Sequence, residues 1–485
     1  MKFKSLLATA LLLLGATAAS ATITSGHYRI VSHNGKYLTE NTNNHTLVCS
    51  DLAEGNFAQV WYVDVDGSNV KLQNTLTTRY IKGQGSVSSQ YTTDTNSTDF
   101  TLGEDNGVYT FKYDPYNWYA GGLHCAANLN VVQYDVAEGK SKWTIETVNV
   151  DPTAVTAQRE AMAEATTSQL TTFFTSTACT ELNSGYVLMS NANLRSAMSE
   201  LPTAVQDMAV KVKNNAWTTY SGWDKTEMNF RIGSYKAYSK HDRWTSILGL
   251  GYSFGRLTNP TGISVTAGEY IQVYVGAIPS GQAVNLEVAG AGQAAGATYT
   301  LHEGMNTLLM ASSGNCFVNY EVDNTNNGST PYTAINNYSP VTVHIEGGTV
   351  NGYFDLTAGD DNADWAKLQE HLLSGDCVEL KTNRLLFHMT TSLVKEACPT
   401  KMVELLGEWN KILNMEYSLM GLEAFNGYWN NLLIATDNIT DYMHATTYGT
   451  YYSNSTLSSV MSYEAMFAGD AIWGPAHENG HIFQK

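Results

Sequence analysis

The chain is poor in charged residues, and this scarcity argues against several classes of partner. Only 15% of its 485 residues are charged, and 27 basic residues stand against 45 acidic ones. The formal net charge of -18 repels phosphate backbones, so nucleic acid is not an expected partner. Little charge combined with abundant Tyr, Asn, Thr, Ser and Gly is more typical of β-rich extracellular proteins than of helical cytosolic enzymes.

The six cysteines lack the spacing of a zinc cluster. No CxxC pair occurs among them, so a cysteine-based zinc site is not supported. An exported protein can form disulfides but need not do so, and the sequence leaves the connectivity open. The cysteines are Cys49, Cys125, Cys179, Cys316, Cys377 and Cys398, of which the last two are nearest in sequence.

Long hydrophobic runs are missing except at the N-terminus. There, Lys2 and Lys4 precede an apolar run over residues 6–16, and Ala19-Ser20-Ala21 forms a small-residue cleavage site. This pattern predicts a signal peptide over residues 1–21 and a mature chain that starts near Thr22. The run is too short to span a bilayer. We therefore expect a secreted, cell-surface or periplasmic protein without a membrane span.

Residues 25–149 contain an internal repeat. Short alternating strands centred on residues 28–30, 70–72 and 109–111 recur 42 and 39 residues apart, and Trp61, Phe100 and Trp143 recur 39 and 43 residues apart. One shared period near 40 predicts a threefold-repeated β domain.

The repeat resembles a β-trefoil of the ricin-lectin type, because Gln59-Val60-Trp61 matches that family's Q-x-W signature once. The resemblance implies that this domain binds glycans. The alternative is that Trp61 and Trp143 serve only the core, as large aromatics on strands usually do.

The rest of a chain this long is expected to form two or three further domains. Helical spacing of apolar residues predicts a helical connector over 150–225, and alternating strands predict a β-sandwich over 226–345. Residues 346–485 mix helical patterns, at 364–373 and 393–413, with a buried strand at 431–435. The expected fold class is therefore multidomain and β-rich, ending in an α/β domain.

The pattern His477-Glu478-Asn479-Gly480-His481 carries the chemistry. Two histidines four residues apart on a helix project from one face and can bind one Zn²⁺. Glu478 can then accept a proton from the water that attacks a carbonyl. Pro475 fits the first turn of such a helix.

Other polar residues are weaker candidates. A lone histidine is more often structural than a ligand, which applies to His371, His388 and His444. Asp360-Asp361 favours a turn or a helix cap, and Glu346-Gly347-Gly348 favours a turn. No GxSxG or P-loop pattern stands out.

The residues on either side of the motif indicate which class of zinc peptidase it resembles. Gln484 stands where a metzincin has glycine, whereas residues 473–484 resemble the zinc helix of the enhancin-like, mucin-degrading peptidases. Residues 259–263 and 266–269 resemble the opening of that family's β-sandwich, so the similarity spans about 230–485.

The resemblance implies a zincin-like catalytic domain in an exported protein that cuts heavily O-glycosylated proteins. By that resemblance His477 and His481 are zinc ligands and Glu478 is the general base. The family's third ligand is a Glu beyond the motif, and the sequence has no matching position before Lys485. We therefore expect a catalytic domain that is incomplete at its C-terminus; any upstream substitute would be sought first at His388, His444 or Glu464.

The leading hypothesis is a secreted zinc metallopeptidase that hydrolyses peptide bonds in glycoproteins such as mucins. The alternative is a lectin-like carbohydrate-binding or adhesion protein that carries an inactive peptidase remnant. The sequence after Lys485 would distinguish the two hypotheses.

Overall fold

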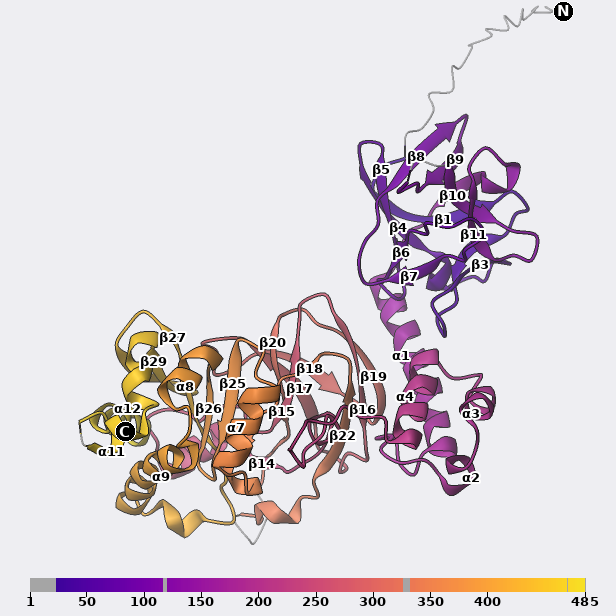
Figure 1. The fold of residues 1–485 in the computed structure, drawn as a ribbon. Coiled ribbons are helices and arrows are strands. Elements are labelled where there is room, and N and C mark those ends of the chain that lie inside the picture. Colours follow the sequence, from indigo (N-terminus) through magenta and orange to yellow (C-terminus); the bar gives the residue numbers. More distant parts are fainter. Residues whose placement is uncertain (1–22, 117–119, 326–331, 469, 485) are drawn as a thin grey trace, which may run out of the picture. The chain divides into compact units, whose positions relative to one another are not determined.

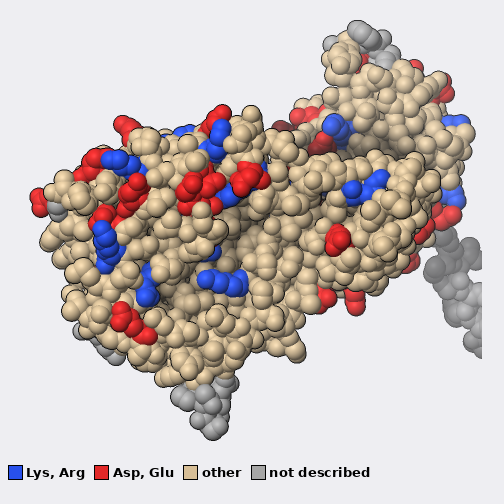
Figure 2. Space-filling model, turned by 60° about the horizontal axis from the view of Figure 1, so that its bottom comes forward, with Lys and Arg blue, Asp and Glu red and all other residues tan. Residues whose placement is uncertain are grey.

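A computed structural model describes residues 23–116, 120–325, 332–468 and 470–484. The predicted signal peptide lies outside these ranges. The chain divides into two compact units, Met1–Arg159 and Glu160–Lys485, which are described separately (Figure 1). Within the described ranges, no helix is both long enough and apolar enough to cross a membrane. Most of the surface seen in Figure 2 is uncharged, in keeping with the low charge content of the sequence.

The first unit is built on a closed ring of six antiparallel strands. In the ring β1 pairs with β4, β4 with β5, β5 with β8, β8 with β9, β9 with β12, and β12 with β1 again. The other six strands form three hairpins. The ring strands are β1 Gly26–Ser32, β4 Trp61–Asp66, β5 Asn69–Asn74, β8 Phe100–Asp105, β9 Val108–Lys112 and β12 Trp143–Thr147. The hairpins are β2 Tyr37–Glu40 with β3 Leu47–Ser50, β6 Tyr80–Lys82 with β7 Thr92–Asp94, and β10 Gly121–Cys125 with β11 Val131–Asp135.

The repeated aromatic residues lie in the core of this barrel. Trp61, Phe100 and Trp143 each begin a ring strand and are fully buried. The indole Nε1 of Trp61 donates to the carbonyl oxygen of Leu38 at 2.9 Å, and that of Trp143 donates to Leu123 at 3.0 Å. These tryptophans serve the threefold core and present no ring to a sugar. The finer assignment to the β-trefoil family stays a prediction.

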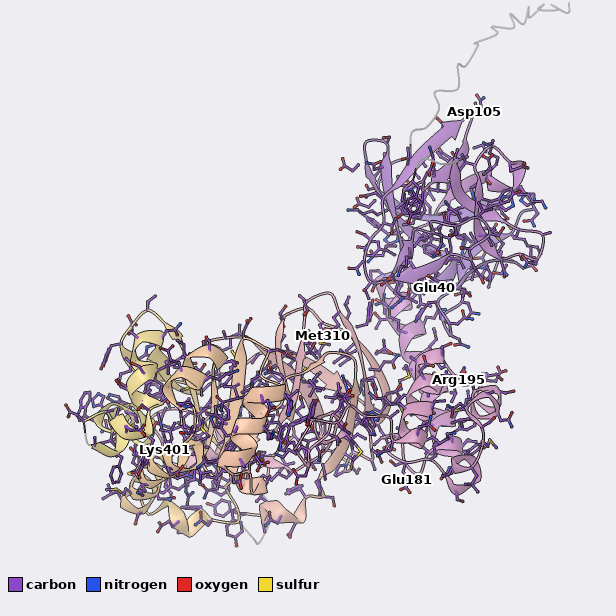
Figure 3. The ribbon with its side chains drawn as sticks, viewed as in Figure 1. Glu40, Asp105, Glu181, Arg195, Met310 and Lys401 are labelled. Atoms are coloured by element: carbon purple, nitrogen blue, oxygen red, sulfur yellow. The ribbon has the colours of Figure 1, made fainter. Side chains whose placement is uncertain are left out.

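A buried carboxylate joins the first two repeats. Glu40 at the end of β2, labelled in Figure 3, is 2% exposed. It accepts hydrogen bonds from the hydroxyls of Thr77 at 2.5 Å and Thr93 at 2.7 Å, and His45 Nδ1 lies 2.8 Å away. A buried carboxylate is tolerated only with such partners, so these bonds help to fix the register of the repeats.

Helices follow the barrel, over residues 152–248. The break between the third and fourth helices falls at Met198–Pro202, because the residue before a proline disfavours helical backbone. The helices are α1 Pro152–Phe173, α2 Ser184–Val187, α3 Asn191–Ala197, α4 Thr203–Asn214, α5 Met228–Arg231 and α6 His241–Leu248.

A four-stranded sheet and a five-stranded sheet share one hydrophobic core between residues 230 and 350. The four-stranded sheet has the order β13 Ile232–Tyr235, β22 Val341–Glu346, β16 Tyr270–Val275 and β19 Gly304–Leu309. The five-stranded sheet has the order β18 Ala297–Leu301, β17 Val284–Ala289, β20 Gly314–Asn319, β15 Pro260–Val265 and β23 Thr349–Val350. A short parallel pair, β14 Tyr238–Ser239 and β21 Glu321–Val322, accompanies them.

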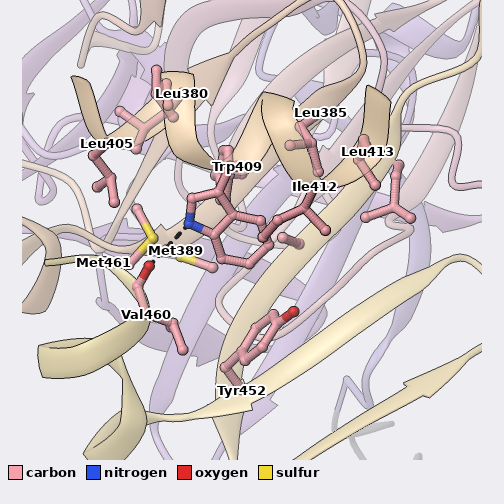
Figure 4. Close-up of a cluster of buried hydrophobic side chains, with 14 of the residues drawn as sticks. Leu380, Leu385, Met389, Leu405, Trp409, Ile412, Leu413, Tyr452, Val460 and Met461 are labelled. Atoms are coloured by element: carbon pink, nitrogen blue, oxygen red, sulfur yellow. Dashed lines mark hydrogen bonds between the residues drawn. The ribbon is translucent and has the colours of Figure 1, made fainter. Parts of the chain in front are cut away.

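The C-terminal region is a mixed six-stranded sheet with helices. Its order is β24 Phe354–Asp355, β25 Cys377–Lys381, β26 Leu385–Thr390, β27 Leu433–Ile439, β29 Gly449–Ser453 and β28 Met443–Thr446. The helices are α7 Asn362–His371, α8 Thr391–Ala397, α9 Met402–Leu419, α10 Leu457–Val460, α11 Tyr463–Ala468 and α12 Trp473–Phe483. Trp409 of α9 lies at the centre of the core and donates to the carbonyl oxygen of Val460 at 2.9 Å (Figure 4).

The structure corrects the prediction of one long helix over residues 393–413. The helical pattern over 393–413 is split into α8 and α9, with a break at Cys398–Lys401. Pro399 causes the break, because proline lacks the amide hydrogen that a helix interior needs. The expected β-rich, multidomain character of the chain is confirmed.

A buried ion pair connects the C-terminal sheet to the five-stranded sheet. His388 of β26 is fully buried; its Nδ1 lies 2.9 Å from Glu379 Oε1 on β25, and its Nε2 lies 2.8 Å from the carbonyl oxygen of Gly290. Asn315 of β20 donates to the same Glu379 oxygen at 2.7 Å. Burial opposes the charged imidazole, but hydrogen bonds to Cys377 and Glu379 raise the pKa of His388 to about 10.

Glu379→Gln should therefore destabilise the protein strongly. The substitution leaves a protonated imidazole buried without its counter-ion, which typically costs about 3–5 kcal/mol. Glu370→Gln is the matched control, because Glu370 pairs with Lys367 at the surface and such pairs contribute about 0–1 kcal/mol. Unfolding midpoints in urea measure both. Equal midpoints for the two variants would contradict the role assigned to the buried pair.

Candidate metal centre

Helix α12 presents two different faces. Gly474, Glu478, Asn479, Ile482 and Phe483 are among its buried residues, whereas His477 is exposed and His481 half-buried. The apolar residues of the first group pack into the core of the C-terminal region. The helix is thereby held by one side and leaves both imidazoles on the other, as the four-residue spacing predicts.

The two imidazoles converge on one point. His477 Nε2 and His481 Nε2 are 3.1 Å apart, and the ring planes are nearly perpendicular at 84°. Two nitrogens bound to one tetrahedral Zn²⁺ at about 2.0–2.1 Å stand roughly 3.3 Å apart. The pair therefore fits one zinc ion. Within the described ranges no group of three or more His, Cys, Asp or Glu residues forms a complete metal site.

Two neighbours shape this pair. The ring of Trp473, which is 61% exposed, stacks on His477 with a centroid distance of 4.7 Å and an interplanar angle of 19°. This stacking restrains the orientation of the imidazole. Glu478, the candidate general base, is 5% exposed and so is largely shielded from bulk water.

The N-terminal end of α12 contacts the edge strand of the sheet. A Cβ at Gly474 would come within 2.7 Å of the Met443 side chain of β28, so the two residues lie against each other. Strand β28 pairs with β29 and is the last strand in the order of its sheet. The motif thus lies beside a strand whose outer edge can pair with another extended peptide.

Helix α9 supports α12 from another side. Tyr417 contacts Phe483 edge to face, with ring centroids 5.6 Å apart. Its neighbour Glu416 reaches to 3.9 Å from the position that a Cβ on Gly480 would occupy. The buried oxygen Oε2 of Glu416 makes no hydrogen bond within the described part of the chain, and burial raises the pKa of this carboxyl to about 8.

Asn479 is a second unusual polar residue of α12. Its side chain is fully buried, and neither amide atom has a hydrogen-bond partner among the described residues. Because buried amides are normally satisfied, we expect this side of the helix to bind ordered water or a further polar group.

The weaker sequence candidates do not join the histidine pair. His388 uses both ring nitrogens in the buried ion pair. His444 of β28 stacks on Tyr451, and Glu464 forms an ion pair with Lys401 at 2.7 Å. His371 lies 2.9 Å from the carbonyl oxygen of Ser221.

The predicted cap and turn are present. Asp361 caps α7 in a capping box with Asp364, and Asp360 pairs with Lys225 at 2.5 Å. Gly347 and Gly348 both have positive φ angles, 94° and 61°, which is the backbone of a tight turn. None of these residues takes part in the site.

Sequence reasoning missed Trp473, Glu416 and Met443 as neighbours of the motif. Trp473 could have been found, because it lies four residues before His477 and so on the same helix face. Glu416 and Met443 reach α12 only through the tertiary fold, and no local pattern marks them.

Residues 352–485 match the family model described as peptidase M60, enhancin and enhancin-like. A metallopeptidase from Bacteroides thetaiotaomicron is similar in structure, with a TM-score of 0.56 and 29% identity over 65% of this chain and 51% of that one. A metallopeptidase in complex with Tn antigen gives a TM-score of 0.48 and 30% identity over 53% of this chain and 48% of that one. No curated protein sequence matches significantly.

The C-terminal region is therefore similar to the enhancin-like M60 metallopeptidases in sequence and in structure. The family match covers the mixed sheet, α9 and the motif helix α12. The chain spans about half the length of the solved structures it matches.

The buried carboxyl of Glu416 predicts a pH-dependent effect on stability. Its pKa is raised from 4.5 to about 8, so the folded state resists ionisation that the unfolded state undergoes. The associated stability is present below pH 4.5 and is lost as the pH rises through 8. Glu416→Gln should therefore raise the melting temperature relative to wild type at pH 9 and change it little at pH 5.

Glu464→Gln is the matched control for this prediction. The Lys401 ammonium beside Glu464 lowers the pKa of this exposed carboxyl, so the substitution should give no gain at high pH. Melting curves of the three proteins at pH 5, 7 and 9 measure the effect. A Glu416→Gln advantage that does not grow with pH would refute the assignment.

Proposed function

We propose that this protein is a secreted zinc metallopeptidase that hydrolyses peptide bonds in glycoproteins such as mucins. The observation that carries the proposal is the 3.1 Å separation of His477 Nε2 and His481 Nε2, with Glu478 on the same helix. The M60 match of residues 352–485 supports the reaction class. Export is part of the proposal and rests on the N-terminal sequence pattern.

Each residue of the motif has a distinct role in the proposed reaction. His477 and His481 would hold the zinc ion, and Trp473 would keep the first imidazole in place. When bound, zinc would polarise the scissile carbonyl and make water more acidic. Glu478 would accept a proton from the attacking water and later pass it to the leaving amine. A glutamate is the third ligand that the family resemblance implies.

Strand β28 is the proposed binding edge for the substrate backbone. It lies at the end of its sheet and contacts α12 through Met443 and Gly474. An extended peptide that adds to this edge gains main-chain hydrogen bonds and passes beside the histidine pair. Such recognition is independent of side chains, so selectivity for glycosylated proteins must come from contacts outside the edge.

The alternative function is a carbohydrate-binding or adhesion protein with an inactive peptidase unit. Glycan binding by residues 25–149 stays a prediction. Because Trp61 and Trp143 are buried, any sugar site of this domain would have to use other side chains.

Zinc content and mucin cleavage test the proposal together. His477→Ala and His481→Ala should each lose zinc, whereas Glu478→Gln should keep zinc and lower kcat/KM by about 10²- to 10⁴-fold. His371→Ala is the control, because this histidine lies outside the pair. Elemental analysis after dialysis and gels of digested mucin give the two measurements.

The outcomes separate the two candidate functions. Zinc retention without cleavage of glycosylated or bare peptide, in a chain that includes the glutamate implied as third ligand, would favour the binding protein. Zinc loss in His444→Ala or Glu464→Gln would instead reveal an upstream third ligand.

A further inference from the structure

Two buried thiols from different repeats meet in the barrel. Cys49 of β3 belongs to the first repeat and is 2% exposed, and Cys125 ends β10 of the third repeat and is fully buried. Both belong to the hydrophobic core of the domain. Each thiol is the largest single influence on the pKa of the other, so the two side chains lie close together.

Backbone contacts hold the two strands together at this point. The amide of Cys49 donates to the carbonyl oxygen of Leu129 at 2.7 Å, and Val48 forms an isolated bridge with Asn130. The turn after β10 is closed by the Ala126 amide, which donates to Asn130 at 2.9 Å. The fold therefore brings the backbone of Cys49 beside the turn that follows Cys125.

The surroundings shift the pKa values of the two thiols in opposite directions. The hydrogen bond from Cys49 and the nearby Lys140 ammonium lower the pKa of Cys125 to about 7, although burial opposes this change. The same hydrogen bond and burial raise the pKa of Cys49. A thiolate beside a thiol is the arrangement from which disulfide exchange proceeds.

The other cysteines have different environments. Burial raises the pKa of Cys179, of Cys316 and of Cys398, which disfavours their thiolates. Cys377 lies beside the imidazole of His388. The pair nearest in sequence, Cys377 and Cys398, thus lacks the mutual contact that Cys49 and Cys125 have.

We propose that Cys49 and Cys125 form a disulfide that links the first and third repeats when the chain folds in the presence of a disulfide oxidant such as oxidised glutathione. The Cys125 thiolate attacks one sulfur of the oxidant and releases one glutathione thiolate. Cys49 then loses its proton and attacks the Cys125 sulfur, which releases the second glutathione thiolate. The two protons end on the two glutathione molecules, and two electrons pass from the cysteines to the oxidant. Because both sulfurs are buried, exchange takes place before the turn over 126–130 closes or while it is open.

Refolding of the reduced full chain in a buffer of oxidised and reduced glutathione tests the proposal. Free thiols are then alkylated, and the chain is digested without reductant for mass spectrometry. The expected product is the Cys49 peptide linked to the Cys125 peptide, with the other four cysteines alkylated. Hydrogen exchange at β3 and β10 should be about tenfold slower in the linked chain than after reduction.

Two variants serve as the control and as the trap for the mixed disulfide. Cys179→Ala is the control and should retain the link, whereas Cys49→Ala should leave glutathione attached to Cys125. Full alkylation of Cys49 and Cys125 after refolding would overturn the proposal. So would a link from either residue to another cysteine, or glutathione that stays on Cys125 in the wild-type chain. These outcomes do not depend on peptidase activity, so the proposal stands or falls separately from the proposed function.

Discussion

The candidate metal centre depends on helix α12 being fixed along one face while the opposite face stays open. Ile482 and Phe483 provide the apolar anchor, and the amide of Gly251 donates to the carbonyl oxygen of Ile482 at 2.9 Å. A Cβ at Gly251 would come within 1.8 Å of the Gln484 carbonyl oxygen, so this approach requires glycine. Met443 restrains the other end of the helix at Gly474. Segments far apart in the sequence therefore set the position of the two imidazoles.

The sheet that carries this helix is in turn tied to its neighbour by a buried charge. His388 and Glu379 lie on adjacent strands of the C-terminal sheet, and their remaining bonds go to Gly290 and Asn315 of the five-stranded region. Buried polar groups need specific partners, so this network favours the observed register between the two regions. Hydrophobic contacts alone would allow the C-terminal sheet to shift slightly against the five-stranded sheet. Such a shift would move β28 and the motif helix together.

Much of this architecture follows from local patterns. The barrel could be predicted because Trp61, Phe100 and Trp143 occupy equivalent positions at a constant period. The motif could be predicted because a helix brings residues four apart to one face. Pro399 by itself predicts a helix break, but the apolar spacing of residues 393–413 continues across it and predicts one long helix. The contacts of Glu416 with α12 were not predictable, because they arise between helices and depend on the packing of side chains that no spacing encodes.

Glu416 shows how such a contact can influence the site. A second ionised carboxylate behind α12 would add negative charge to a helix that already carries Glu478. Burial of Glu416 without a partner for Oε2 raises its pKa to about 8, so it is mostly neutral near pH 7. The fold thus places a carboxyl group beside Gly480 that adds little negative charge at neutral pH. At high pH, where this carboxyl ionises, it lowers the free energy of unfolding. If the motif works as proposed, Glu478 of α12 exchanges protons with the substrate, and Glu416 of α9 takes no part in that exchange.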